Sequence, residues 1–278
     1  MPVHKNHWFT IPGGRTGVLL VHGLCGTPTE MRFIANGLAR AGYTVHCPQL
    51  AGHCGGEDDI KATTWQDWYR SAEEGLALLS GLCDRVIVGG LSTGAVLALL
   101  LAARHPEKVS GLTLYSPTLW LNGRHIPWYA HLFRLVTSRT FANLFRFPAP
   151  LEFGIKDHRL RTFIKQALAA LGAPAVDYST PGIAVLERRR LVNAVLGRIG
   201  AIKVPALILH PREDDYANLS NATYLQENLP GQVDLVVLED SYHLVTIDRQ
   251  RGVVLDRTLA FLDRISAARD PSERNLAA

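Results

Sequence analysis

The sequence is poor in cysteine, with only four among 278 residues. Cys25, Cys47, Cys54 and Cys83 form no C-x-x-C pair, and they are too sparse for the disulfide framework of a small secreted domain. We therefore expect free thiols in a reducing compartment, which indicates a cytoplasmic protein. The spacing of Cys47, His53 and Cys54 matches no common zinc site, so neither a metal ion nor another cofactor is expected.

Long hydrophobic runs are also absent. The longest apolar run, 95–103, has about half of the roughly 18 residues that a membrane-spanning helix needs, and Arg104 follows it directly. The first fourteen residues contain no apolar core of the kind found in secretory signal peptides. The sequence thus predicts neither stable membrane insertion nor export by a signal peptide.

Charge is present in modest amount but is unevenly distributed. The chain carries a net charge of +4, yet the stretch 118–200 has twelve Lys and Arg against four Asp and Glu, or +8, which leaves −4 for the remainder. Solvated helix faces explain such a segment best, although it could also attract an anionic substrate. No motif typical of nucleic-acid binding accompanies the charge, and the oligomeric state is not indicated.

Short, fully apolar runs recur along the chain, with helical patterns between them. Continuous rather than alternating apolar residues are typical of strands that are covered on both faces, as in a parallel sheet. The expected strands are 18–21, 43–47, 86–88, 112–114, 206–209 and 235–238. The expected helices are 65–79, 93–103, 221–228, 253–267 and one that starts near Thr27. The alternation predicts an α/β fold with a mostly parallel, doubly wound sheet.

The start of the first of these helices carries a specific signal. Thr27 is a candidate N-cap, Pro28 suits the first helical position, and Glu30 stands three residues after the cap, where a capping-box glutamate belongs.

The alternation stops between Pro117 and Lys203. This stretch is basic and rich in aromatic residues, prolines divide it into three or four expected helices, and it contains no convincing buried strand. We predict a helical cap at 118–202, inserted into an α/β core formed by 1–117 and 203–278. The polar tail from residue 268 onward is expected to be frayed.

Gly90-Leu91-Ser92-Thr93-Gly94 is a G-x-S-x-G motif between an expected strand and an expected helix. A sharp turn from strand to helix strains the serine backbone and presents its hydroxyl, while the flanking glycines remove side chains that would collide. Because the motif alone is common, this context decides the interpretation. Ser92 is the predicted nucleophile, and the competing interpretation is a glycine-rich loop.

A nucleophilic serine needs a base, and the base needs an acid. His243 follows the last expected strand, in a loop where this architecture presents its base, and a surface histidine is the alternative. Asp214 follows the strand 206–209 and is the predicted acid. The adjacent Glu213 and Asp215 are competitors that spacing does not exclude.

The reaction also needs two donors for the oxyanion. One is expected to be the backbone N–H of Thr93, directly after the nucleophile. The other is expected from the loop His22-Gly23-Leu24-Cys25-Gly26, where Leu24 is the predicted donor. The alternative is that the glycines of this loop only make a tight turn into the helix near Thr27, and both interpretations can hold together.

Five segments together resemble the carboxylesterase and monoacylglycerol lipase branch of the α/β-hydrolase superfamily. They are LLVHGLCGTPTEMR, PQLAGHCGG followed by TTWQDWYRSAEEGL, VGGLSTGAVLAL, ALILHPREDDYAN and DSYHLVTID. The resemblance covers most of the chain outside 117–203, and it implies the same nucleophile, acid, base and oxyanion donors. Cys54 stands where the family usually has glycine, and His210-Pro211 replaces a glycine-containing turn, so both departures could reshape the pocket.

These observations predict a serine hydrolase that cleaves a small carboxylic ester through an acyl-enzyme. An apolar cap suggests a short to medium acyl chain or a monoglyceride. Two alternatives stay open: a thioesterase or acyltransferase that uses an acyl-CoA-like substrate, and a ligand-binding protein on a hydrolase scaffold. Carbon–carbon bond hydrolysis and cofactor-free haloperoxidation also use this triad.

Overall fold

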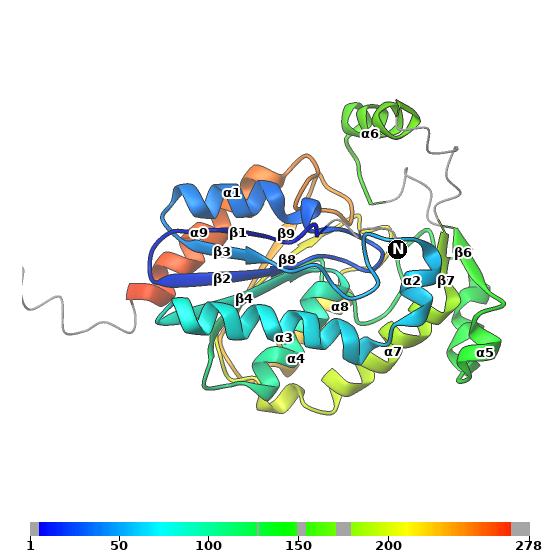
Figure 1. Cartoon of the computed structure of the whole chain (residues 1–278), viewed down its shortest axis with the longest axis horizontal. Helices are drawn as coiled ribbons and strands as arrows, with labels where there is room; N and C mark the ends of the chain where they lie inside the picture. Colours follow the sequence, from blue (N-terminus) through cyan, green and yellow to red (C-terminus); the bar gives the residue numbers. More distant parts are fainter. Residues whose placement is uncertain (1–5, 127, 149–153, 171–178, 268–278) are drawn as a thin grey trace, which may run out of the picture.

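The computed structural model describes residues 6–126, 128–148, 154–170 and 179–267, so the expected frayed tail lies outside the described residues. Seven strands form the central sheet in the order β1-β3-β2-β4-β5-β8-β9 (Figure 1). They are β1 (Phe9–Ile11), β2 (Thr16–Val21), β3 (Thr44–Cys47), β4 (Arg85–Leu91), β5 (Val109–Tyr115), β8 (Ala206–Pro211) and β9 (Val233–Leu238). All neighbours are parallel except β1, which pairs antiparallel with β3. The predicted mostly parallel sheet is confirmed, and β1 is the strand that the apolar runs did not reveal.

Helices cover both faces of this sheet. On one face lie η1 (Pro28–Met31), α1 (Arg32–Arg40) and α9 (Arg251–Ala267); on the other lie α3 (Trp65–Leu82), α4 (Thr93–Arg104), α7 (Gly182–Leu196) and α8 (Ser220–Asn228). The short α2 (Glu57–Ala62) precedes α3. The two layers confirm the predicted doubly wound α/β architecture.

Strand β2 shows why the predicted strands read as continuous apolar runs. Val18 and Leu20 face the core under α1 and α9, whereas Leu19 and Val21 face the core under α3 and α4. All four side chains are fully buried. A strand with helices on both faces has no solvent side, so its sequence has no polar alternation.

The predicted cap, 118–202, contains two longer helices, α6 (His158–Ala170) and α7, and several small elements. The small elements are η2 (Trp128–Leu135), α5 (Arg139–Ala142), β6 (Arg146–Pro148), β7 (Ser179–Pro181) and η3 (Ile199–Ala201). β6 and β7 pair as a separate two-stranded sheet. Helix α7 packs against α3 and α4, with Leu191 and Val195 in the same core cluster as these helices, while α5, α6 and the small sheet lie beyond one end of the main sheet (Figure 1).

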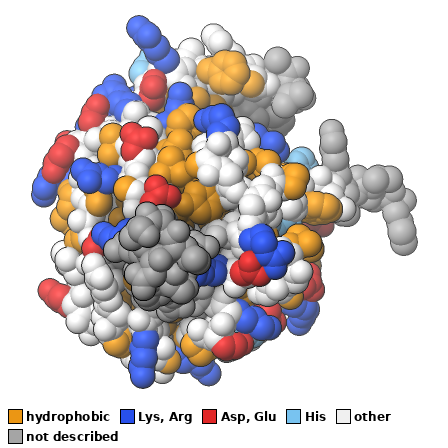
Figure 2. Space-filling model, turned by 90° about the vertical axis from the view of Figure 1, so that its left-hand side faces the viewer, with side chains coloured by type: hydrophobic (Ala, Val, Ile, Leu, Met, Phe, Trp, Pro, Cys, Tyr) orange, Lys and Arg blue, Asp and Glu red, His pale blue; other side chains and the backbone are white. Residues whose placement is uncertain are grey.

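The surface carries interspersed charges. On the face shown in Figure 2, lysines and arginines alternate with acidic side chains, and hydrophobic side chains lie between them. Among the described residues, no helix combines the length and apolar character that crossing a membrane requires. All four cysteines are free thiols, as expected.

Candidate active site

Ser92 lies at the turn between β4 and α4. Its backbone has φ 57° and ψ −112°, a region that side-chain-bearing residues rarely occupy. The turn is fixed by hydrogen bonds from Ser92 N to the Tyr115 carbonyl (2.9 Å) and from Ala95 N to the Ser92 carbonyl (3.1 Å). A strained serine at a strand-to-helix turn is what the G-x-S-x-G motif predicts.

The two glycines of the motif are required by close backbone approaches. A Cβ atom on Gly94 would lie 2.1 Å from the Val21 carbonyl oxygen, and one on Gly90 would lie 2.3 Å from the Gly94 carbonyl carbon. Both neighbours are backbone atoms, which cannot swing aside as a side chain can. The glycines therefore let α4 start directly above the ends of β2 and β4.

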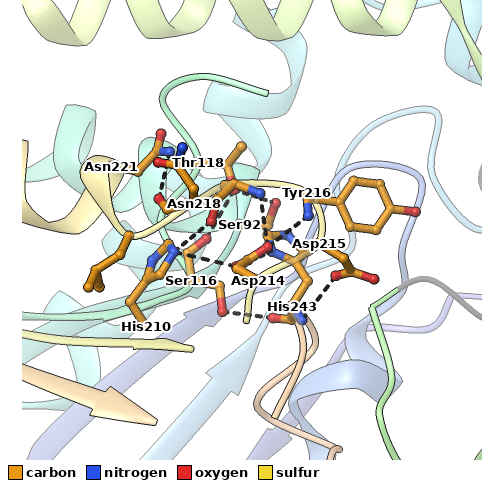
Figure 3. Close-up of polar contacts among 12 residues, drawn as sticks. Ser92, Ser116, Thr118, His210, Asp214, Asp215, Tyr216, Asn218, Asn221 and His243 are labelled. Carbon is orange, nitrogen blue, oxygen red and sulfur yellow. Dashed lines mark hydrogen bonds and ion pairs between the residues drawn. The ribbon is translucent and has the colours of Figure 1, made fainter. Parts of the chain in front are cut away.

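His243 and Asp214 meet at the carboxyl ends of β9 and β8 (Figure 3). His243 Nδ1 lies 2.8 Å from Asp214 Oδ2 and 3.0 Å from Oδ1, and both side chains are buried. Burial lowers the pKa of His243, but the charge and hydrogen bond of Asp214 outweigh it, so the net pKa is raised above 6.5. The pair is thus arranged to stabilise an imidazolium.

Of the three neighbouring carboxylates, Asp214 contacts the His243 ring, whereas Asp215 accepts from the His243 backbone N–H (3.4 Å). Asp215 Oδ2 accepts a hydrogen bond from Gly154 N (2.6 Å), and the exposed Glu213 pairs with Lys156 Nζ (2.8 Å). Asp214 instead accepts from the backbone N–H groups of the loop at 2.8 and 2.9 Å. Burial raises the pKa of Asp214, but the His243 charge and these donors bring it below its ordinary value.

Residues that sequence reasoning did not assign to the site hold these loops in place. The fully buried His210 lies 2.7 Å from the Ala217 carbonyl through Nε2, and burial lowers its pKa, so this departure from the family pattern braces the loop that carries Asp214. Ser116 Oγ donates to the His243 carbonyl (2.7 Å). Thr118 Oγ1 lies 3.2 Å from Ser92 Oγ, so the serine hydroxyl hydrogen-bonds with Thr118 rather than with His243 (Figure 3).

Leu24 and Thr93, the two predicted oxyanion donors, border the same cavity as Ser92. Thr93 is the first residue of α4, where backbone N–H groups have no partner within the helix. The Leu24 loop is held by Glu30, whose Oε2 accepts from Gly23 N (3.1 Å). Glu30 was expected to cap its own helix; Thr27 does cap η1, accepting from Thr29 N (3.3 Å), while Glu30 reaches back to this loop.

The cavity above the strand ends has a volume of about 1010 Å³. Ser92, His243, Leu24 and Thr93 border it, so four of the five predicted site residues share one space, and Asp214 lies behind His243. Its remaining walls come mainly from the loop 52–56, the start of α2 and the predicted cap. Cys54, the other departure from the family pattern, also borders the cavity and has a φ of 68°, which explains why glycine is usual there.

Residues 14–250 match the family described as serine aminopeptidase, S33 (Hydrolase_4). The chain belongs to this family. A thermostable monoacylglycerol lipase from Bacillus sp. (strain H-257) is 32% identical over 255 residues, which are 91% of this chain and 92% of the relative. A carboxylesterase from Bacillus subtilis (strain 168) is 24% identical over 259 residues, covering 92% and 96% of the two chains.

The solved structures agree with this assignment. One, whose description names LipS and LipT, two metagenome-derived lipolytic enzymes, superposes with a TM-score of 0.78 and 28% identity over 95% of this chain and 99% of the other. A soluble variant of the Saccharomyces cerevisiae monoglyceride lipase has a TM-score of 0.76 at 16% identity, over 93% of this chain and 91% of the other, which supports the fold. The predicted α/β-hydrolase fold and the expected class, a carboxylic ester hydrolase, are confirmed.

Proposed function

We propose that this family member hydrolyses carboxylic esters with Ser92 as nucleophile, His243 as general base and Asp214 as the acid that orients it. The observation that carries the proposal is the strained turn at Ser92, bordering the same cavity as a histidine whose Nδ1 lies 2.8 Å from a buried aspartate. Strain of this kind persists only where the surrounding structure imposes it, and it concentrates at functional sites.

The reaction proceeds in two halves. His243 takes the proton of Ser92 Oγ as the oxygen attacks the ester carbonyl, and the N–H groups of Leu24 and Thr93 bind the resulting oxyanion. His243 then gives the proton to the departing alcohol, which leaves an acyl group on Ser92. Water, deprotonated by His243, attacks this acyl-enzyme and releases the acid. Before attack, Ser92 Oγ must turn from Thr118 toward His243.

The substrate is proposed to be an ester with a short to medium acyl chain, or a monoacylglycerol. The cavity is bordered by apolar side chains of the predicted cap, among them Leu132, Phe133, Val136 and Val185. Such walls suit the aliphatic part of an acyl group. The monoacylglycerol lipase and the carboxylesterase among the relatives act on substrates of this class by their names.

A thioesterase or acyltransferase that uses acyl-CoA is the second candidate, because the predicted cap is basic. Much of that charge is engaged within the fold, however: Arg139 and Arg190 pair with Glu187, and Arg146 pairs with Glu57. We therefore favour a carboxylic ester over an acyl-CoA. Turnover of butyryl-CoA and 4-nitrophenyl butyrate, compared at low and high salt, separates the two, since an electrostatic preference for CoA fades with salt.

The variant Ser92→Ala tests the proposal. Its kcat for 4-nitrophenyl butyrate should fall by at least about 10⁴-fold, because the remaining groups cannot form an acyl-enzyme. Unchanged circular dichroism and melting temperature would show that the fold is intact. Hydrolysis at the wild-type rate by this variant would refute the role of Ser92.

The third possibility, a binding protein on a hydrolase scaffold, has a separate test. A fluorophosphonate probe should label the wild-type chain at Ser92 and leave Ser92→Ala unlabelled. A wild-type chain that neither reacts with the probe nor turns over any ester would favour binding over catalysis.

A further inference from the structure

Helix α7 carries a buried cation at the edge of the cavity. Arg188 is only 6% exposed, and it borders the same space as Ser92 and His243. Arginine is almost never buried without a partner of opposite charge, because removing a guanidinium from water is costly. The position of Arg188 on α7 alone therefore does not explain why its charge is buried.

The neighbouring charges of α7 all have partners, which makes Arg188 different from them. Glu187 is paired with Arg139 (2.6 Å) and Arg190 (2.7 Å). Arg189 donates to two backbone carbonyl oxygens of the predicted cap. Among the described residues, by contrast, Arg188 has no carboxylate within 4.0 Å.

The hydrogen bonds of Arg188 use only one end of its guanidinium. Nη1 donates to the carbonyl oxygens of Thr118 (2.9 Å) and Leu119 (3.4 Å). Nε is buried and has no partner within the described chain. Nη2 donates to no described residue and is not among the buried atoms without a partner, so it keeps accessible surface on a residue that borders the cavity.

The cation remains charged under ordinary conditions. Burial lowers the pKa of Arg188 to about 10, and the nearby charge of Arg189 acts in the same direction. At neutral pH the cavity thus contains a positive charge that carbonyl dipoles solvate on one side only.

Thr118 places this charge close to the reacting serine. Its carbonyl oxygen accepts from Arg188, and its hydroxyl lies 3.2 Å from Ser92 Oγ. A single residue therefore separates the guanidinium from the nucleophile. A ligand group bound by Arg188 would belong to the same small molecule whose carbonyl is attacked by Ser92.

We propose that Arg188 is a specificity-determining residue that binds a carboxylate of the substrate, so that the preferred ester is a monoester of a short dicarboxylic acid. This inference rests on the proposed ester hydrolysis and adds the chemistry of the acyl group. The bound carboxylate supplies the opposite charge that Arg188 lacks, and the aliphatic links of the diacid lie against the apolar walls.

A carboxylate fits this position better than the other acceptors do. Charge-assisted hydrogen bonds to a guanidinium are about twice as strong as neutral ones, so a neutral carbonyl would compensate the buried charge less well. A phosphate monoester carries up to two charges at neutral pH and would be harder to desolvate between apolar walls. The acyl side of a dicarboxylic monoester brings one negative charge at a fixed distance from the ester.

The test compares two esters with five-carbon acyl groups, mono-4-nitrophenyl glutarate and 4-nitrophenyl pentanoate. The ratio of their kcat/KM values should fall by about 10- to 100-fold in Arg188→Met, mainly through KM for the glutarate ester, as expected for losing a hydrogen bond to a charged group. Turnover of the pentanoate should fall much less than that of the glutarate ester, because the pentanoyl group has no carboxylate for Arg188 to bind. Arg188→Lys should retain part of the preference.

Arg198→Met is the matched control, because it removes one positive charge just after α7, and neither Arg198 nor Ala194, whose carbonyl oxygen it contacts, borders the cavity. Its ester ratio should equal that of the wild type. The melting temperature gives an independent readout: replacing a buried, unpaired cation with an apolar side chain of similar length should not lower it. Free glutarate should also inhibit pentanoate turnover competitively in the wild type, and more weakly in Arg188→Met.

Two results would overturn the assignment. An equal loss for both esters in Arg188→Met, with a lower melting temperature, would make Arg188 a structural brace for the Thr118 loop. Stronger inhibition by glycerol 3-phosphate than by glutarate would replace the carboxylate with a phosphate. Failure of the proposed function looks different, because then the wild type would turn over neither ester or Ser92→Ala would remain active.

Discussion

The carboxyl ends of the strands and the predicted cap at 118–202 build the two halves of the cavity in different ways. At the strand ends, Asp214 and His243 are buried and hydrogen-bonded. The predicted cap leaves large apolar side chains exposed, with Trp128 at 76% and Leu135 at 75%. The strand ends are thus held by many mutual contacts, whereas the predicted cap contributes apolar surface that is only partly covered.

This difference assigns separate tasks to the two regions. Reaction geometry must be held within a fraction of an ångström, which requires residues whose backbones are fixed by packing. Recognition of the aliphatic part of the acyl group needs an apolar wall of suitable shape, and a cluster around Phe133 supplies it. Substitutions at the strand ends should therefore change rate constants, while those in the predicted cap should change which ester is preferred.

The strongest test of the comparison, after Ser92→Ala, is Asp214→Asn. It should reduce kcat by about 10³- to 10⁴-fold, because the amide no longer stabilises the imidazolium or holds its tautomer. Without the negative charge, burial should lower the pKa of His243, so the residual kcat/KM should persist to lower pH than in the wild type. Steady-state kinetics between pH 5 and 9 measure both effects.

Asp215→Asn is the matched control for this experiment. Its carboxylate accepts from Gly154 N and from the His243 backbone N–H, so the substitution should perturb the loop but keep the hydrogen bond between Asp214 and the His243 ring. We expect a loss of no more than about tenfold in kcat, from altered loop placement. Equal losses in the two variants would remove the distinction between the aspartates.

The strand-end region was largely predictable from the sequence because its constraints leave recognisable patterns. Gly90 is required by a close approach to Gly94 in the same turn, Gly94 by the Val21 carbonyl of the neighbouring strand β2, and buried strands leave continuous apolar runs. Spacing could not separate Asp214 from Asp215, since adjacent loop residues point in different directions only after the loop closes on His210. The short edge strand β1 was missed because three half-buried residues give no periodic signal.

Residues that act across the fold were not predictable. Glu30 has the spacing of a capping glutamate, but its carboxylate reaches Gly23 instead. Arg188 resembles its neighbours Arg189 and Arg190 in the sequence, and only the packing of α7 under the cavity distinguishes it. The division of the chain into core and cap stays a prediction. Because α7 packs on α3 and α4 of the core, the boundary of the cap around α7 is the part of this division to test.

The role of the predicted cap in acyl recognition can be tested with Phe133→Ala. Phe133 borders the cavity and packs its ring against Phe145 and Phe147, at centroid distances of 5.4 and 4.9 Å. Removing the ring enlarges the acyl space, so the kcat/KM ratio of 4-nitrophenyl octanoate to acetate should change by about tenfold. The kcat for acetate should change much less, because the strand-end residues are untouched.

Leu144→Ala is the control for that prediction, since Leu144 is 75% exposed and does not border the cavity. Its octanoate-to-acetate ratio should match the wild type. A Phe133→Ala variant that loses kcat for both esters equally would indicate that the predicted cap also holds the reaction geometry, which would contradict the division of tasks.

The smallest expected effect concerns Glu30, the acid that holds the Leu24 loop near the strand ends. Burial raises the pKa of its carboxyl to about 7, although the hydrogen bond from Gly23 N acts in the opposite direction. An acid with a higher pKa in the folded chain stabilises the fold fully below its unfolded pKa of about 4.5 and loses this contribution as the pH rises through about 7. Folding should therefore weaken over that interval because of Glu30.

Glu30→Gln should remove this part of the pH dependence, because the amide still accepts from Gly23 but does not ionise. Relative to wild type, the variant should gain a few degrees in melting temperature between pH 5 and pH 8, which corresponds to about 1 kcal/mol for a chain of this size. Its kcat/KM should stay within about threefold, since the oxyanion loop keeps its hydrogen bond. The exposed Glu227→Gln serves as control, and melting curves for Glu30→Gln that run parallel to wild type across this range would show that Glu30 is already ionised at pH 5.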